Sequence, residues 1–268
     1  MKRIAIYCVT YNSYECLTNF LLSIKNSVKL STASIDITIY IADNTEKNTK
    51  EIGWDVEGIN VIPFAFHKNY GYFGAIHRMM AETDYQSFDL VIISNVDIEL
   101  STDFIDRVVD NQCLDSNCNI GWIAPQIYSK AEQRDRNPKM LSRYSLRKLK
   151  ALHFLFQHPA LYHLYRLSAY KRKKYIKHQP GEIYGGHGSF IILTRTYFER
   201  CGIINYPVFL FGEEIYLAEQ CRKHGLKVVY DPSIKVIDTE HTSTSKMRSR
   251  FYCNCNVKAL EYIMSAFY

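Results

Sequence analysis

The sequence is sparing with residues that break or cross-link a chain: its 268 positions include 12 glycines and 7 prolines. That composition excludes collagen-like repeats and Pro/Gly-rich disorder. No apolar run reaches the roughly 20 residues of a membrane-spanning helix. The N-terminal apolar stretch is short and lacks a small-residue cleavage site, so we expect no secretory leader. The eight cysteines follow neither a disulfide framework nor zinc-finger spacing, and we expect reduced core thiols.

Acidic residues are almost missing from one segment. Between residues 134 and 178 the chain has thirteen Lys and Arg and a single acid, Asp135, whereas the remainder has a net charge of −6. A local excess of charge indicates a local partner. Leucines and aromatics alternate with these cations, and the pattern predicts two helices that are broken near Pro159.

An anionic membrane surface is the partner we favour for 134–178, because interfacial helices combine a basic face with an apolar one. A nucleic-acid surface would suit the charge, but no nucleic-acid motif accompanies it, so we expect no nucleic-acid partner. A solvated or dimer-forming helical hairpin is the remaining alternative.

Short β-branched apolar runs alternate with segments of helical periodicity. We expect strands at residues 3–9, 35–42, 60–66, 88–94, 189–194 and 227–230. Ser13 and Ser101 are candidate caps for the helices that follow them, Gly225 closes a helix over 213–224, and Asp231-Pro232 ends the last strand. An amphipathic helix is expected from residue 246. This rhythm predicts an α/β fold with a mostly parallel central sheet covered by helices.

Three polar clusters follow predicted strands at their carboxyl ends: Thr10-Tyr11-Asn12, Asp43-Asn44 and Asn95-Val96-Asp97. Ligands of such sheets bind at this edge. Asp and Asn also form turns there, which is the competing explanation for any one cluster. Three clusters on one edge favour a nucleotide site.

The order of these motifs resembles family 2 glycosyltransferases of the GT-A fold, especially the bacterial branch that builds surface polysaccharides. Further matching segments are 69–74, 209–214 and 238–243. The resemblance implies one GT-A domain over 1–268. Within it, 1–125 is the nucleotide-binding half, 126–182 a basic helical insertion, 183–245 the acceptor-side half and 246–268 a C-terminal helix.

The resemblance also implies a donor site for a nucleotide-diphosphate sugar, with UDP- or dTDP-sugars favoured. Its donor-binding residues would be Thr10, Tyr11, Asn12, Asp43, Asn44, Asn69, Gly71, Asn95 and Arg248. Asn95 stands where the family has the first Asp of its metal motif. The Arg-Asn often found in the family's tail is Cys-Asn here, at 253–254 or 255–256.

A divalent cation, Mn or Mg, is the implied cofactor, with Asp97 and His241 as its ligands. Such a cation compensates the charge of a departing diphosphate. In the alternative, Asp97 accepts hydrogen bonds from loop amides, and His241 is a loop residue that binds no metal.

The acidic pair Glu213-Glu214 stands where the family has its catalytic Glu-Asp pair. The resemblance implies that Glu214 is the general base and that Glu213 orients the acceptor. Acids at a helix N-terminus also stabilise the helix, which is the competing explanation. His187 and Gly186, within Gly-Gly-His-Gly, are placed on the acceptor side, with a tight turn as the alternative.

Together these features predict an inverting, metal-dependent hexosyl- or deoxyhexosyltransferase. Its acceptor would be a glycan, lipid-linked, in capsule- or O-antigen-type synthesis at the cytoplasmic face of the inner membrane. A non-catalytic binding module of the same fold stays open because of Asn95. A sugar nucleotidyltransferase is disfavoured, because the loop after the first strand lacks the Gly-rich, Arg-containing sequence of that class.

Overall fold

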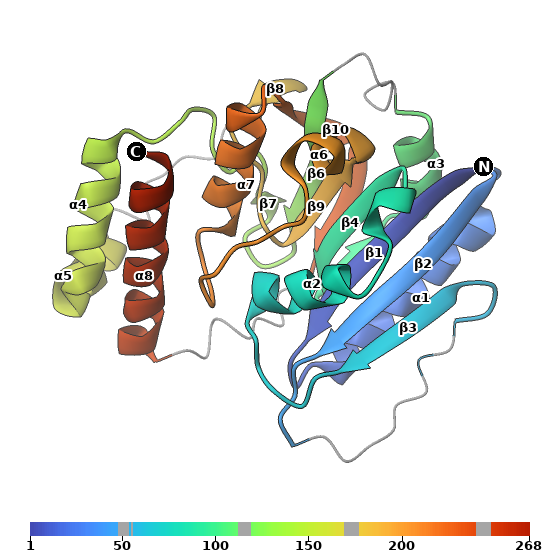
Figure 1. Ribbon diagram of the computed structural model, residues 1–268, viewed down its shortest axis with the longest axis horizontal. Coiled ribbons are helices and arrows are strands. Elements are labelled where there is room, and N and C mark those ends of the chain that lie inside the picture. Colours follow the sequence, from blue (N-terminus) through green and yellow to red (C-terminus); the bar gives the residue numbers. More distant parts are fainter. Residues whose placement is uncertain (48–53, 55, 112–118, 169–176, 240–247) are drawn as a thin grey trace.

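The computed structural model describes residues 1–47, 54, 56–111, 119–168, 177–239 and 248–268, and one mixed sheet organises them (Figure 1). The strands are β1 (Lys2–Thr10), β2 (Ile35–Asp43), β3 (Asn60–Ala65), β4 (Leu90–Asn95), β5 (Ile98–Leu100), β6 (Ile120–Ser129), β7 (Arg134–Asp135), β8 (Gly181–Ile183), β9 (Phe190–Thr194) and β10 (Lys227–Asp238). The helices are α1 (Tyr14–Leu30), α2 (Tyr72–Ala81), α3 (Phe104–Val109), α4 (Leu146–Gln157), α5 (Pro159–Ser168), α6 (Arg195–Cys201), α7 (Glu213–Lys223) and α8 (Ser249–Phe267), with a 3-10 turn at Tyr85–Ser87.

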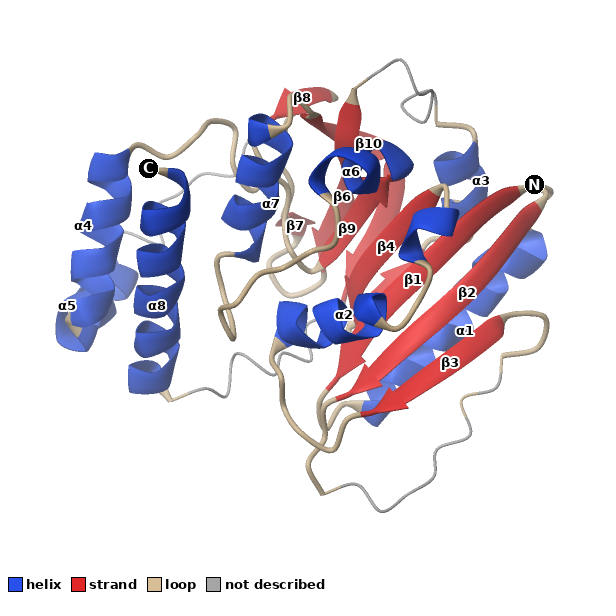
Figure 2. Ribbon diagram, viewed as in Figure 1, coloured by secondary structure: helices blue, strands red, loops and turns tan. Residues whose placement is uncertain are grey.

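The sheet order is β3-β2-β1-β4-β9-β6-β10-β5, with β7 beside β6 and β8 beside β10. The long strands β3, β2, β1 and β4 pair in parallel, as do β6 and β10. The shorter strands β5, β7, β8 and β9 pair antiparallel. The expected α/β fold with a mostly parallel central sheet is confirmed. Helices cover both faces of the sheet (Figure 2), and strands buried on both faces read as continuous apolar runs.

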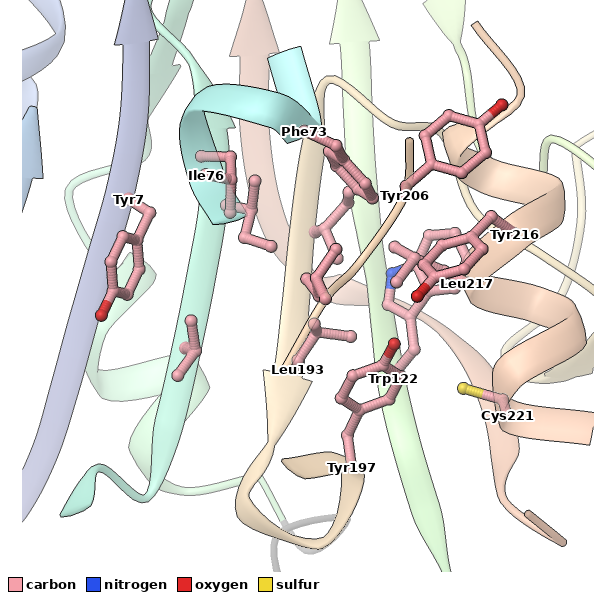
Figure 3. Close-up of a cluster of buried hydrophobic side chains, with 14 of the residues drawn as sticks. Tyr7, Phe73, Ile76, Trp122, Leu193, Tyr197, Tyr206, Tyr216, Leu217 and Cys221 are labelled. Carbon is pink, nitrogen blue, oxygen red and sulfur yellow. The ribbon is translucent and has the colours of Figure 1, made fainter. Parts of the chain in front are cut away.

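The two faces of β1 carry two separate cores. Ile4, Ile6 and Cys8 pack with α1 and α3 on one face, whereas Ala5 and Tyr7 join the cluster beneath α2, α6 and α7. This division follows from the two-residue period of a strand. Figure 3 shows the second cluster, in which aromatic side chains from the sheet, α6, α7 and the loop before α7 meet.

Three local predictions need correction. Ser13 is at the N-cap of α1, but its hydroxyl donates to the Tyr11 carbonyl oxygen at 3.1 Å instead of capping. Asp103, not Ser101, is the N-cap residue of α3. Strand β10 continues past Asp231-Pro232 to Asp238, because a register shift between Asp231 and Lys235 places the proline in a bulge, where its missing N–H is tolerated.

The basic segment forms α4 and α5, which meet at Pro159, the first residue of α5. A proline is tolerated in the first turn of a helix, because its missing N–H has no intrahelical partner there. Both helices pack against α8, and we call α4, α5 and α8 the helical arm (Figure 1). Residue 126 lies inside β6, so the helical part of the segment begins later, at Leu146. The cations at 171–174 lie outside the described residues.

A buried carboxylate ties the arm to α7. Glu219 accepts from Arg143 Nε at 2.6 Å, from the Tyr184 hydroxyl at 2.5 Å and from Arg222 Nε at 2.8 Å. Arg143 also donates to the Phe267 carbonyl oxygen at 2.8 Å, at the end of α8. Burial alone would raise the pKa of Glu219, but these three donors together lower it.

Candidate functional site

A cleft of about 950 Å³ opens at the carboxyl ends of β1, β2 and β4 and is bounded by the start of α7 and by the helical arm. Its position agrees with the rule for ligands of open α/β sheets. The structure brings together in its lining most of the predicted site residues: Tyr11, Asn12, Asn44, Asn69, Gly71, Asn95, Asp97, His187, Glu213 and Glu214.

Asn44, Asn69 and Gly71 form one hydrogen-bonded unit in the floor of the cleft. Asn44 Nδ2 donates to the Gly71 carbonyl oxygen at 2.9 Å, and the Gly71 N–H donates to Asn69 Oδ1 at 2.9 Å. Asn44 is buried, and its Oδ1 has no hydrogen-bond partner among the described residues. The side chain of Asn44 thus braces the loop at 69–71 and does not present its oxygen to the cleft.

Thr10 and Asp43 lie beneath this unit rather than in the lining of the cleft. The carboxylate of Asp43 accepts from the Thr45 N–H at 2.9 Å and from the Tyr14 hydroxyl at 2.9 Å. The Thr10 carbonyl oxygen accepts from the Asn44 N–H at 2.9 Å. Both residues therefore hold the loops that carry Asn12 and Asn44 in place.

Glu213 and Glu214 open α7 and differ in environment. Glu213 is buried, and desolvation, followed by the charge of Glu214, raises the pKa of the Glu213 carboxyl well above its usual range. Glu214 is half-buried, and its Oε1 accepts from the Gly188 N–H at 3.3 Å. The raised pKa favours the protonated form of Glu213, and Glu214 is the less buried acid of the two at the cleft.

Asn95 ends β4 and Asp97 lies in the turn that leads to β5, at the other side of the cleft. The Asp97 carbonyl oxygen accepts from the Thr239 N–H at 3.0 Å, so the segment that leads to His241 starts beside Asp97. His241 itself lies outside the described residues, and within the described part of the chain no group of three or more His, Cys, Asp or Glu is arranged for a metal.

The oxygen donors at this turn nevertheless fit one class of metal. Mg²⁺ and similar hard cations in nucleotide sites are bound through one or two carboxylates and completed by substrate phosphates. Asp97 supplies the carboxylate and Asn95 an amide oxygen. This donor set is suited to a divalent cation that arrives with a diphosphate.

His187 faces the cleft as a neutral imidazole. The Ser189 N–H donates to His187 Nδ1 at 3.2 Å, and the Ser189 hydroxyl lies 2.9 Å from the same nitrogen, an arrangement that favours the ring proton on Nε2. Desolvation, followed by the charges of Lys139 and Arg136, lowers the pKa of His187 well below its usual value. His187 therefore offers the cleft a hydrogen-bond donor without a charge.

Two further predicted site residues, besides Thr10 and Asp43, lie outside the cleft lining. A Cβ on Gly186 would lie 2.7 Å from the Ala124 Cβ, so Gly186 packs against the sheet rather than against an acceptor. Arg248 is exposed immediately before α8 and is not part of the cleft lining. Both positions depend on packing between distant segments, which the motif pattern does not report.

Several residues of the cleft were missed by sequence reasoning. Arg136 and Lys139 belong to the basic segment but line the cleft, where Arg136 Nη1 lies 2.7 Å from Asp238 Oδ2. Gly188, whose N–H donates to Glu214, could have been found from the sequence, because it belongs to the Gly-Gly-His-Gly motif. No sequence motif pointed to the aromatic residues of the cleft: Phe156, Phe209, Phe211, Phe251 and Tyr252. Of the two Cys-Asn pairs in the tail, the second contributes Asn256 to the lining.

The family model of glycosyl transferase family 2 matches residues 6–202. The chain belongs to that family. The matched range contains the donor-site motifs at 10–12, 43–44, 69–74 and 95–97 and ends before Glu213. A search of curated proteins returned no match.

The fold of this family 2 glycosyltransferase is also that of a solved structure, described as GalNAc-T7 with UDP, GalNAc and Mn²⁺. The TM-score is 0.58 at 12% sequence identity, over 97% of this chain and 48% of the other. The chain thus spans about half the length of that protein. At this identity the likeness shows the GT-A fold alone. No helix in the described residues is long and apolar enough to span a membrane.

Proposed function

We propose that this family 2 glycosyltransferase moves a hexosyl or deoxyhexosyl group from a UDP- or dTDP-sugar to a hydroxyl of a glycan acceptor, with inversion. The convergence of Asp97 and Glu214 in one cleft carries the proposal, because phosphate compensation and proton removal are the two requirements of the reaction.

In this mechanism Glu214 is the general base. The acceptor oxygen forms a bond to the anomeric carbon while the bond from that carbon to the diphosphate oxygen breaks, and the hydroxyl proton goes to Glu214. The Gly188 N–H orients the carboxylate of Glu214, and Glu213 holds its own proton and can donate to the acceptor. General-base assistance of this kind contributes about 10²–10⁴-fold in rate.

Asp97 and Asn95 would hold a divalent cation, Mn or Mg, which compensates the negative charge of the diphosphate when bound. Asn95 also supports the alternative, a non-catalytic module that binds nucleotide sugars. In that alternative a nucleotide still binds, but no sugar is transferred.

Nucleotide-dependent thermal stability tests the donor site. The protein is melted with UDP, dTDP, GDP or CDP, each with and without manganese, as wild type and as Asp97→Ala. A ligand at 100 times its dissociation constant adds about 2.7 kcal/mol. We expect a manganese-dependent upward shift with UDP or dTDP that is lost in Asp97→Ala. No shift with any diphosphate would overturn the proposed donor site.

A membrane-bound acceptor is part of the proposal. The helical arm exposes Leu161, Leu164 and Leu167 along α5, and exposed cations lie on the adjoining α4: Arg147, Lys148 and Lys150. Each cation near an anionic leaflet contributes about 1 kcal/mol. The arm would thus hold the enzyme at the cytoplasmic face of a bacterial inner membrane, where a lipid-linked glycan of capsule or O-antigen type is extended.

Vesicle sedimentation tests this docking. We expect binding to vesicles with anionic phospholipid, weak binding to phosphatidylcholine alone, and loss of binding in the double variant Leu164→Ser, Leu167→Ser. Leu22→Ser is the matched control, because Leu22 is 53% exposed but lies on α1, away from the arm. No binding to either vesicle type would leave the alternative, a solvated or dimer-forming hairpin.

A further inference from the structure

The cleft has two chemically different halves. The half at the carboxyl ends of β1, β2 and β4 presents amides and carboxylates and is the proposed site of the nucleotide donor. The other half is formed by the loop before α7 and by the arm, and its side chains include Phe156, Phe209, Phe211, Phe251 and Tyr252. We call these five residues the aromatic wall.

Ring contacts hold the aromatic wall together across segments that are far apart in the sequence. The Phe211 and Tyr252 centroids are 4.8 Å apart, those of Phe156 and Tyr252 6.1 Å, and those of Phe209 and Phe251 6.4 Å. These pairs are edge-on, the geometry that aromatic rings favour. The wall joins the loop that leads into Glu213 and Glu214 to α4 and α8 of the arm, so it is continuous with the catalytic end of the cleft.

The wall also continues outward. The ring of Phe156 lies 5.0 Å from that of Tyr162 on α5, and Tyr162 stacks on Tyr252 at 5.6 Å. Helix α5 carries the exposed leucines of the arm. Apolar surface thus extends from the catalytic acids to the face that we assign to the membrane.

A sugar alone would leave this surface in contact with water. The side chain of Phe251 is 47% exposed and that of Phe209 36% exposed, although both line the cleft. Exposed apolar surface beside a polar catalytic group indicates a ligand that is polar at one end and apolar at the other.

We propose that the aromatic wall is the subsite for the apolar aglycone of the acceptor, a lipid chain whose sugar hydroxyl faces Glu214. This inference rests on the proposed function, because it assumes an acceptor at Glu214. It assigns the acceptor to glycolipids and gives the lipid a place inside the cleft, distinct from adsorption of the arm on a bilayer.

Alkyl glucosides of increasing chain length are the probe. Binding of methyl, hexyl and octyl β-D-glucoside is measured by calorimetry below the micelle concentration, with saturating UDP and manganese. Burial of one methylene contributes about 0.8 kcal/mol, so we expect affinity to rise roughly fourfold for each methylene that is buried. Phe251→Ser should flatten this dependence on chain length.

Phe154→Ser is the matched control. Phe154 is 56% exposed on the same arm but is not part of the cleft lining, so the variant should keep the full chain-length dependence. Equal affinity for all three glucosides, or an equal loss in both variants, would overturn the subsite. Wild-type self-association that Phe251→Ser abolishes would overturn it too, since a second copy would then occupy the wall.

The manganese-dependent nucleotide shift is measured on the same samples. It should persist in Phe251→Ser, because the donor half of the cleft is unchanged. A failed proposed function would appear as a missing nucleotide shift in the wild type, whereas a failed subsite would appear as a normal shift without dependence on chain length.

Discussion

A Cβ added to Gly71 would lie 2.0 Å from the Phe209 carbonyl oxygen, so these two residues bring the donor loop and the loop before α7 into direct backbone contact. Gly71 has φ +75°, a conformation that side chains other than glycine's rarely adopt. The contact couples the loop under the nucleotide to the loop that presents Glu213 and Glu214.

Gly71→Ala should therefore push these two loops apart. We expect a loss of about 1–3 kcal/mol in stability from overpacking and loss of the nucleotide-dependent melting shift. Gly58→Ala is the control, because Gly58 has φ +79° but no atom within 4 Å of its added Cβ. Both variants bear the backbone strain, and only Gly71→Ala bears the clash. Similar nucleotide shifts in the two variants would contradict the coupling.

Glu214→Gln should abolish turnover without abolishing donor binding. An amide cannot take the acceptor proton, so kcat should fall by about 10²–10⁴-fold. The manganese-dependent melting shift should remain, since Glu214 lies on the acceptor side. Donor turnover is followed by release of the nucleoside diphosphate. A variant that retains wild-type kcat would remove Glu214 from the role of base.

Glu213→Gln should stabilise the fold, and the gain should grow with pH. Because burial raises the Glu213 pKa, the folded state binds this proton more tightly than the unfolded state. The wild type thus loses stability as pH rises from the unfolded carboxyl pKa, about 4.3, to the raised folded value. Thermal melts from pH 4 to 9 measure the difference between variant and wild type. Glu57→Gln is the control, because its exposed side chain shows how stability changes with pH when a carboxyl that is not buried is removed. A difference that does not change with pH would contradict a protonated Glu213.

Arg143→Met should loosen the arm from α7. The variant leaves the buried Glu219 with two of its three donors, and loss of a hydrogen bond to a charged group costs about 1.5–3 kcal/mol. Because the bound donors lower the pKa of Glu219, their contribution is present above the usual carboxyl pKa and is lost as pH falls through the lowered value. Denaturant unfolding at pH 7 and pH 3 measures this. Arg147→Met, at an exposed position on α4, should be near neutral.

The sequence by itself determined the layered α/β fold and the strand ends that meet at the cleft. Strand β1 shows why: its alternating apolar side chains can be buried only between two helical layers, and the residues after it then lie at the ligand edge. The family could also be predicted from the sequence, because its motifs are short, local and ordered along the chain. Glu213 and Glu214 could be predicted for the same reason, because they are adjacent in one short motif.

Only the tertiary structure decided which residues share the cleft. Lys139 carries the same charge as its neighbours on the arm, yet the path of the chain from β7 to α4 turns it into the cleft. Gly186 packs on the sheet, although it lies two residues from Gly188, which orients Glu214. The aromatic wall assembles from three separate segments. Such contacts depend on packing between elements distant in sequence, and no local pattern encodes the direction in which a loop side chain points.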